Sequence, residues 1–470
     1  MAEGQKEPPP PEFLFLSPLE NETVTYRDTR IYQPRDKELK TNTYIFDIPN
    51  KEQMSVIDLP NVKMLLHLEL IKSSNSAKLA NDELTCVPAN DLPHEMWRNV
   101  QVKINNVIVS SNDNHYATRA FYKKMKNYTK ELQEMEFDYT GFYAGEDMHD
   151  KVGEAVRYKE ETTGDVGGTT AVLTKEVDAN LADKCQGLFF QRGTDTATAG
   201  RSHWFEDHIY ECPFTGHSYL PYGIPLEVTF TKHSKQSFYL KGANQALYEV
   251  KVKDFILKVP YLQLSPEAFM NLETSITSKD TPMLSMWMDS LVVTDKALVD
   301  GRTEHGIDNL FGTRAGGVMP ELVTFGITSV DSWEGKPTTF NHLYEHNKLK
   351  RYTFTLPGAR QLPSTQLPAM DFAEGQFELP YKDLLEAWQL KANGQSTVLT
   401  KEVFAESQCL FAVQFTPLPP DPNTAQSTGI GDMNLDLTFD TAPNRKTLVL
   451  FGEFKDRISI GKNKEIMVSW

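Results

Sequence analysis

Cysteine is scarce in this sequence, which has four cysteines in 470 residues and no pair in a CxxC arrangement. The wide spacing excludes a disulfide-rich secreted scaffold and a cysteine-based structural zinc site. We therefore expect buried free thiols in a chain that is made and used in a reducing compartment; they are Cys86, Cys185, Cys212 and Cys409.

Long apolar runs and basic clusters are missing too. No stretch approaches the roughly 18 apolar residues of a membrane-spanning helix, and the segment MAEGQKEPPPPEF lacks the basic and apolar regions of a signal peptide. With 64 acidic against 48 basic residues, the formal net charge is −16, which disfavours sequence-independent binding to a phosphate backbone. We expect a soluble chain with no membrane insertion and no direct nucleic-acid binding.

Recognisable catalytic and metal-binding patterns are absent as well. The most enzyme-like stretch is SHWFEDHIYECPFTGH, but a zinc hydrolase needs two ligands on one helical face, as in HExxH. Pro213 and Gly216 argue against a helix, so we predict a polar loop that enters a strand. An enzyme using this stretch is a less favoured hypothesis; its groups would be His203, Glu206, Asp207, His208 and His217.

Two further motifs fall short of a site. HLYEH places His342 and His346 four residues apart, without an apparent third metal ligand. GTRAGG, at 312–317, lacks the Lys-Ser/Thr of a phosphate-binding loop. The sequence therefore predicts no catalytic, cofactor-binding or metal-binding residues, no cofactor and no enzymatic activity.

Aromatic and alternating segments, in contrast, are abundant. The chain has 26 Phe and 18 Tyr, and MNLDLTFD (433–440) alternates apolar and polar side chains as a half-buried strand does. Because 470 residues exceed one ordinary core, we expect two domains, each an antiparallel sandwich. Strands are predicted at 23–32, 42–48, 62–71, 187–191, 226–232, 237–241, 248–264, 282–294, 321–330, 349–356, 409–418, 433–440 and 447–454; short helices at 114–126, 265–272 and 380–390; and long loops at 145–185, 296–320 and 357–377.

A weak internal repeat supports the division into two domains. LEVTF at 226–230 and LDLTF at 435–439 share one pattern, and each is followed by a polar turn with Lys and another strand. VKDFILKV then follows in the first half and FKDRISI in the second. We predict two similar β-sandwiches in tandem, with the border near 250–265.

A tight hairpin followed by an aromatic-rich helix stands out in the first half. In NVQVKINN, Val100, Val102 and Ile104 face one side of a strand. Asn105-Asn106 suits a type I′ turn, since both central residues need positive φ and Asn tolerates it. The cluster at 112–114 is expected to cap the helix that follows.

This region resembles the hexon-like major capsid proteins of Polinton (Maverick) elements and adintoviruses. In that family V-x-V-x-I/L-N precedes a polar turn and a Y-x-x-R-A helix, matched here at 100–105 and by Tyr116, Arg119 and Ala120. ALYEVKVKDFILKVPYLQLSPEAF looks like the family's crossover between halves, and GDMNLDLTFD with TLVLFGEFKDRISIGKNKEIMVSW looks like its terminal strands. The similarity covers most of the chain in order.

The resemblance implies an all-β double jelly roll: two tandem eight-stranded antiparallel jelly-roll sandwiches with a few short helices in loops. It implies an extended arm at 1–20, a first jelly roll at 21–255 and a second at 256–470. The expected function is structural: pseudo-hexameric homotrimers that tile an icosahedral capsid, with neighbouring capsomers, a penton-type vertex protein and minor capsid proteins as partners. The expected location is the virion, after synthesis in the host cytoplasm, with nuclear assembly left open.

One alternative from a different class stays open. The chain could be a two-domain β-sandwich carbohydrate-binding protein whose exposed aromatic side chains stack on sugars. Under the capsid hypothesis, aromatic residues in the long loops are instead expected at contacts between subunits; they are Trp204, Phe205, Trp287, Phe311 and Trp333.

Overall fold

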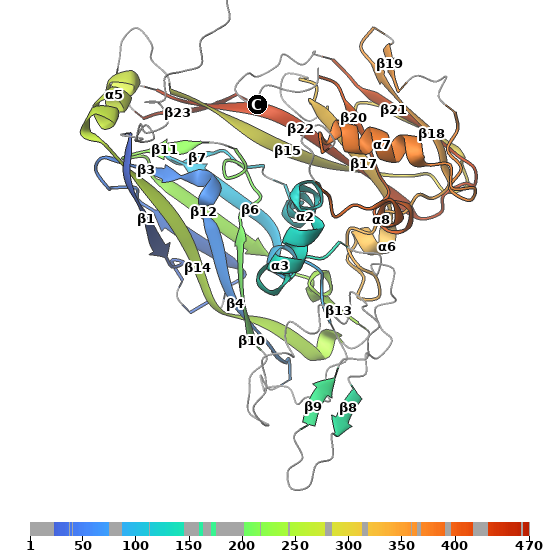
Figure 1. The fold of residues 1–470 in the computed structure, drawn as a ribbon, viewed down its shortest axis with the longest axis horizontal. Helices are drawn as coiled ribbons and strands as arrows, with labels where there is room; N and C mark the ends of the chain where they lie inside the picture. Colours follow the sequence, from blue (N-terminus) through green and yellow to red (C-terminus); the bar gives the residue numbers. More distant parts are fainter. Residues whose placement is uncertain are drawn as a thin grey trace, which may run out of the picture.

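The strands arise where apolar and polar residues alternate, as in β12 (Leu226–Lys232), whose Leu226, Val228 and Phe230 are buried. A computed structural model shows how they assemble (Figure 1). It describes residues 23–36, 38–39, 41–74, 87–111, 113–144, 159–162, 171–174, 202–216, 218–242, 245–277, 284–312, 318–358, 360–363, 368–390, 396–416, 431–461 and 464–469.

The first sandwich packs a larger sheet against a four-stranded one. The larger sheet has the order β10-β4-β14-β3-β11, with β1 also paired to β14, and the smaller has the order β2-β12-β6-β7. The bounds are β1 (Val24–Tyr32), β2 (Thr43–Ile48), β3 (Ser55–Asp58), β4 (Lys63–Lys72), β6 (Trp97–Ile104), β7 (Val107–Ile108), β10 (Ser202–His208), β11 (Tyr219–Pro221) and β14 (Tyr248–Leu264).

The second sandwich has the same plan. Its sheets have the orders β15-β22-β17-β20, with β23 paired to β22, and β16-β21-β18-β19. The bounds are β15 (Leu284–Ala297), β16 (Glu304–Ile307), β17 (Leu322–Ser329), β18 (Leu349–Leu356), β19 (Arg360–Leu362), β20 (Leu410–Gln414), β21 (Asn434–Phe439), β22 (Lys446–Ile460) and β23 (Ile466–Ser469).

The two sandwiches repeat one strand order. Eight strands of each sandwich correspond in chain order. In the first sandwich they are β1, β2, β4, β6, β7, β10, β12 and β14, and in the second they are β15 to β22. When each set is numbered from one to eight, both sandwiches pair the first strand with the eighth, the eighth with the third and the third with the sixth. Their second sheets agree in the same way. LEVTF and LDLTF lie on the matching strands β12 and β21, so the internal repeat is confirmed.

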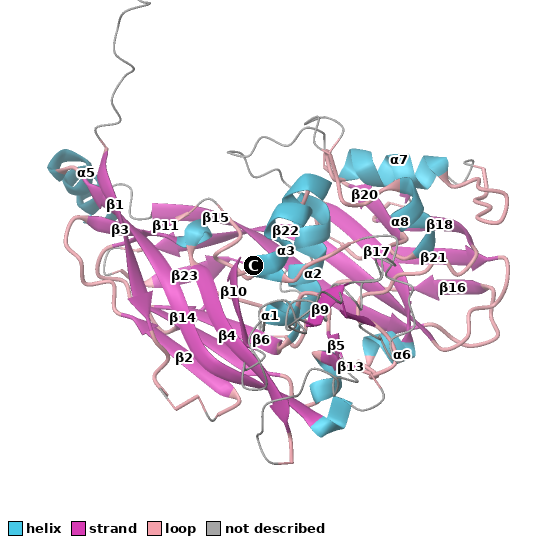
Figure 2. Ribbon diagram, turned by 60° about the horizontal axis from the view of Figure 1, so that its bottom comes forward, coloured by secondary structure: helices cyan, strands magenta, loops and turns pink. Residues whose placement is uncertain are grey.

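Helices fill the same connection in each half. Between β7 and β10 lie α2 (Tyr116–Asn127) and α3 (Lys130–Thr140), and between β19 and β20 lie α7 (Glu378–Ala387) and α8 (Lys401–Glu406). In Figure 2, α2 and α3 stand between the two sandwiches. The remaining bounds are α1 (Leu92–Glu95), α5 (Pro266–Thr277), α6 (Val330–Trp333), β5 (Val87–Pro88), β13 (Leu240–Lys241), β8 (Lys159–Thr162), β9 (Ala171–Thr174) and the 3₁₀ turns η2 (Leu59–Asn61), η5 (Gln236–Phe238) and η6 (Gln245–Leu247).

Most predicted elements are present, and the errors fall in connections. The three predicted helices correspond to α2, α5 and α7, whereas α3 and α8 were not predicted. The predicted loops are wrong where they contain the short strands β8, β9, β16 and β19. The strand predicted at 237–241 begins within η5 and ends as β13, which pairs with β5. The strand predicted at 187–191 lies outside the described residues. No helix in the described ranges is both long and apolar enough to cross a membrane.

The hairpin prediction is confirmed and the capping prediction is wrong. Asn105 and Asn106 have φ of 47° and 65°, as a type I′ turn requires. Helix α2 begins after His115, which makes no side-chain cap. Asp113 accepts a hydrogen bond from the backbone N–H of His115, the N-cap residue itself, so this bond does not cap the first turn of the helix. Asn112 lies outside the described residues.

The hydrophobic cores cross the line between the halves. Strands β15, β22 and β23 extend over the first sandwich (Figure 1), so that Met288 and Ile458 join its core. In return, Phe121, Tyr122 and Met125 of α2 join the core of the second sandwich. The boundary expected between 255 and 256 falls inside β14.

Candidate functional site at the joint between the sandwiches

The histidine- and carboxylate-rich stretch forms a strand, so the predicted polar loop is wrong at 202–208. Strand β10 pairs with β4 and places alternate residues on opposite faces. His203 and Asp207 are buried, whereas Glu206 points outward to Lys258, with Oε2 2.5 Å from Nζ. On the same outer face His208 lies with Nδ1 3.1 Å from the Pro60 carbonyl oxygen. His217 lies outside the described residues. The alternation therefore separates the groups that an active site would need together.

Asp207 instead joins a buried group with Asp91 and His94. Their ligand atoms lie within 4.8 Å of one another, the spacing of a metal site. However, Lys124 Nζ lies 2.5 Å from both Asp91 Oδ1 and Asp207 Oδ2, and so supplies the positive charge there. The residues present fit a lysine-centred ion network and not a metal centre.

Lys124 and Asp207 each stabilise the charged form of the other. Burial alone would raise the pKa of Asp207, but Lys124 and His94 hold it well below its usual range. Burial would lower the pKa of Lys124, and the two carboxylates raise it above the ordinary value. His94 Nε2 lies 3.1 Å from Asp207 Oδ2, and its Nδ1 lies 3.0 Å from the Tyr116 hydroxyl.

Arg119 anchors the same helix a turn earlier. Its side chain is 2% exposed, and it binds Asp113 and Glu211, the latter with Nη2 2.5 Å from Oε2. Burial raises the pKa of Glu211 to about 7, although Arg119 counteracts the rise. The Tyr116 and Arg119 of the Y-x-x-R-A pattern are therefore anchors of α2 to the first sandwich.

The opposite side of α2 binds the second sandwich. The Tyr122 hydroxyl lies 2.9 Å from Thr324 Oγ1 and donates to Glu453 Oε1 at 2.9 Å. Lys126 Nζ lies 2.7 Å from the same carboxylate oxygen. Burial would raise the pKa of Glu453, but Lys123 and Lys126 lower it to about 2. Helix α2 thus joins both sandwiches through charged contacts.

The contacts of α2 were not predicted, although the basic residues of the helix are a signal for them. Helix α2 carries Arg119, Lys123 and Lys124 among its aromatic residues, and the structure buries all three. A buried cation needs an acidic partner. Arg119 has one nearby in Asp113, but its second partner, Glu211, lies 92 residues away, and Asp91, a partner of Lys124, lies 33 residues away. Only the tertiary fold brings them together.

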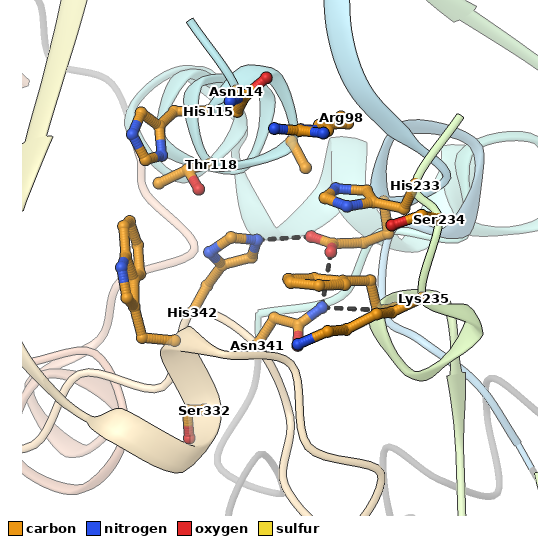
Figure 3. Close-up of a pocket in the computed structure, with 14 residues that line it drawn as sticks. Arg98, Asn114, His115, Thr118, His233, Ser234, Lys235, Ser332, Asn341 and His342 are labelled. Carbon is orange, nitrogen blue, oxygen red and sulfur yellow. Dashed lines mark hydrogen bonds and ion pairs between the residues drawn. The ribbon is translucent and has the colours of Figure 1, made fainter. Parts of the chain in front are cut away.

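A cavity of about 350 Å³ opens beside this joint. Figure 3 shows His342 and Asn341 on one side of the cavity, with Thr118 of α2 and His115, the residue before α2, above them and with His233 and Ser234 to the right. His342 Nε2 binds the Glu95 carboxylate, and Asn341 Nδ2 donates to Glu95 Oε2 at 2.6 Å.

The motifs HLYEH and GTRAGG do not form sites either. The segment 342–346 is not helical, and the His346 ring stacks on Phe372 at a centroid distance of 4.4 Å. His342 and His346 therefore do not form an i, i+4 metal pair. Within GTRAGG, only Gly312 belongs to the described residues.

The aromatic residues expected in loops are distributed differently. Trp204 and Phe205 lie in β10, Trp287 in β15 and Trp333 in α6, while Phe311 lies in a connection but is buried. Of the five, Trp204 at 39% and Trp287 at 41% are the most exposed. Trp204 stacks on His67 at 4.4 Å, and Arg457 lies 5.8 Å above the ring of Trp287. The prediction that all five lie in loops at the surface is wrong.

The prediction of buried cysteines is confirmed for the two that lie in the described residues. Cys409 is buried and free, and burial raises the pKa of its thiol. Cys212 is buried as well, with its Sγ 3.2 Å from Met288 Sδ. Cys86 and Cys185 lie outside the described residues.

Comparison with solved structures gives the fold class. A chain of the Sputnik virophage, from the 3.5 Å cryo-EM structure, has 8% identity and a TM-score of 0.56, with 100% of this chain and 93% of that chain covered. PBCV-1 VP54, fitted into a reconstruction of the virophage Sputnik, has 10% identity and a TM-score of 0.50, with 97% and 99% covered. The mavirus major capsid protein has 11% identity and a TM-score of 0.47, with 100% and 96% covered.

The chain is a double jelly roll, as the resemblance implied. At these identities the likeness concerns the fold. No protein-family model matches the chain, and no curated protein sequence matches it.

Proposed function

We propose that the chain is a viral major capsid protein that forms hexon-like trimers. The observation that carries this proposal is the repetition of one strand order in both sandwiches. Three chains with two similar sandwiches each supply six similar units around a closed ring. Such a ring fits a hexagonal position in an icosahedral shell. The whole-length likeness to a chain of the Sputnik virophage supports the same role.

The finer parts of the proposal follow from the sequence resemblance. The lineage is that of Polinton elements and adintoviruses, carried by the V-x-V-x-I-N and Y-x-x-R-A patterns. The protein is structural rather than enzymatic, and its place is the virion, after synthesis in the host cytoplasm. Its partners are neighbouring capsomers, a penton-type vertex protein and minor capsid proteins, and a separate basic protein condenses the genome.

Light scattering of the purified protein tests the proposal. We expect a trimer of 53.3 kDa chains that survives dilution, because obligate ring interfaces are large and apolar. Negative-stain images are expected to show hexagonal capsomers. A stable monomer at micromolar concentration contradicts the capsid proposal and favours the carbohydrate-binding alternative, which a glycan array would then test.

A further inference from the structure

A buried lysine, an asparagine and a glutamate meet at the edge of the joint. Lys241 lies in β13 of the first half and is 0% exposed. Its Nζ lies 2.7 Å from Asn341 Oδ1, in the second half of the chain. Asn341 Nδ2 donates to Glu95 Oε2 at 2.6 Å and to the Phe238 carbonyl at 2.8 Å.

This arrangement has the parts of an amide-exchange reaction. Lys241 is a nucleophile beside a side-chain amide, and Glu95 touches the nitrogen that would leave. Fixed proximity of this kind replaces a bimolecular encounter, and a carboxylate on the leaving nitrogen can act as a general acid–base group. We propose that Lys241 and Asn341 become joined by an isopeptide bond, with Glu95 as the proton carrier.

The protonation states suit this chemistry. Burial lowers the pKa of Lys241 to about 7, although the Glu95 carboxylate counteracts the fall. A substantial fraction of the amine is therefore neutral and nucleophilic near neutral pH. Burial would raise the pKa of Glu95, but His342 and Asn341 lower it, so the carboxylate is ionised and ready to accept a proton.

The step balances without any co-reactant. The neutral Lys241 Nζ attacks Asn341 Cγ, and Glu95 accepts a proton from the attacking nitrogen. Glu95 then returns that proton to Nδ2, the Cγ–Nδ2 bond breaks, and one ammonia leaves. The adjoining cavity of about 350 Å³, which Asn341 and Glu95 line, gives the ammonia a route out.

The bond would join the two halves of the chain covalently. The backbone already brings the segments together, since the Gly242 N–H donates to the Pro337 carbonyl at 2.7 Å and Lys241 Nζ lies 3.2 Å from the Lys336 carbonyl. The inference concerns chemistry within one chain and stands independently of the proposed capsid role.

Peptide mass spectrometry of the purified full-length protein tests the inference. We expect a branched peptide that contains Lys241 and Asn341 and is one ammonia lighter than the sum of its parts. Lys241→Met, Asn341→Ala and Glu95→Gln are each expected to abolish the branched peptide. Lys336→Met is the matched control, because only the backbone carbonyl of Lys336 contacts the site; this variant is expected to keep the link.

Two results would overturn the inference. One is recovery of Lys241 and Asn341 from the unaltered protein in separate, unmodified peptides. The other is an ammonia loss at Asn341 that persists in Lys241→Met, which would indicate cyclisation of the Asn341–His342 backbone instead. The first result needs no variant, so the test does not depend on any variant folding.

Discussion

At the scale of single residues, Lys124 is the most consequential charge in the joint. Its side chain is 0% exposed, and its two partners, Asp91 and Asp207, are at most 2% exposed. Removing one member of a buried ion pair leaves an uncompensated charge, which is far more harmful than losing a surface pair. Lys124 therefore makes a large contribution to the attachment of α2 to the first sandwich.

We predict that Lys124→Met lowers the free energy of unfolding by about 3–5 kcal/mol. Urea denaturation followed by fluorescence measures the change. The matched control is Lys350→Met, which breaks the exposed pair with Asp440 and is expected to leave the midpoint almost unchanged. Equal midpoints for the two variants would mean that the buried network contributes no more than a surface pair.

Glu453 makes the stability of the joint depend on pH. Its folded pKa of about 2 lies below the ordinary value of 4.5, so protonation opposes folding. Its contribution is fully present above about pH 5 and is lost as the pH falls toward 2. We predict that Glu453→Gln destabilises the protein at pH 7 by about 1–3 kcal/mol and that the difference from the unaltered protein shrinks by pH 3.

Urea midpoints at pH 7, 5 and 3 check this prediction. The control is Glu374→Gln, at an exposed position, for which no such convergence is expected. A gap between Glu453→Gln and the unaltered protein that stays constant across this range would contradict the assigned role of Glu453.

At the scale of elements, the turn between β6 and β7 sets the register of the hairpin. Asn106 has a φ of 65°, which is costly for a β-branched residue and free for glycine. We predict that Asn106→Val lowers the free energy of unfolding by about 1–3 kcal/mol, while Asn106→Gly stays close to the unaltered protein. Urea midpoints of the two variants provide the measurement, and equal loss in both would mean that the Asn106 side chain matters more than its φ.

Elements governed by local sequence were predictable, and those governed by distant contacts were not. The strand β12 and its counterpart β21 follow from alternation, and the turn follows from Asn105-Asn106. Strand β10 was mistaken for a polar loop because two of its inward residues, His203 and Asp207, are polar; Asp207 is buried against Lys124. This segment is a strand because it pairs with β4, which lies more than 130 residues earlier in the chain.

The role of α2 as a link between the two sandwiches could not be predicted from local sequence either. Its aromatic spacing predicts a helix, and α2 confirms it. The spacing does not reveal that nearly the whole helix is buried, because that burial needs both sandwiches at once. The charged residues Arg119 and Lys124 are compatible with a solvated face until Glu211 and Asp207 are placed beside them.

At the scale of the whole molecule, the two sandwiches share their cores. Phe121, Tyr122 and Met125 come from the first half and are at most 2% exposed within the core of the second sandwich. Met288 and Ile458 make the reverse crossing and are fully buried in the core of the first. Each half therefore lacks part of its own core, although each has a complete set of eight strands.

We predict that the halves do not fold apart, even when the cut spares β14 and α5. Fragments 21–280 and 281–470 are each expected to lack a cooperative thermal transition. The second fragment loses three large buried side chains of α2, and each such loss typically costs about 2–5 kcal/mol. Together these losses rival the roughly 5–15 kcal/mol that stabilises a typical domain. Co-expression of the two fragments is expected to restore a single transition, because it restores both cores. Calorimetry of the separate and combined fragments makes the measurement. A cooperative transition in fragment 281–470 alone, near the temperature of the intact chain, would show that α2 is an accessory to the second sandwich and not a part of its core.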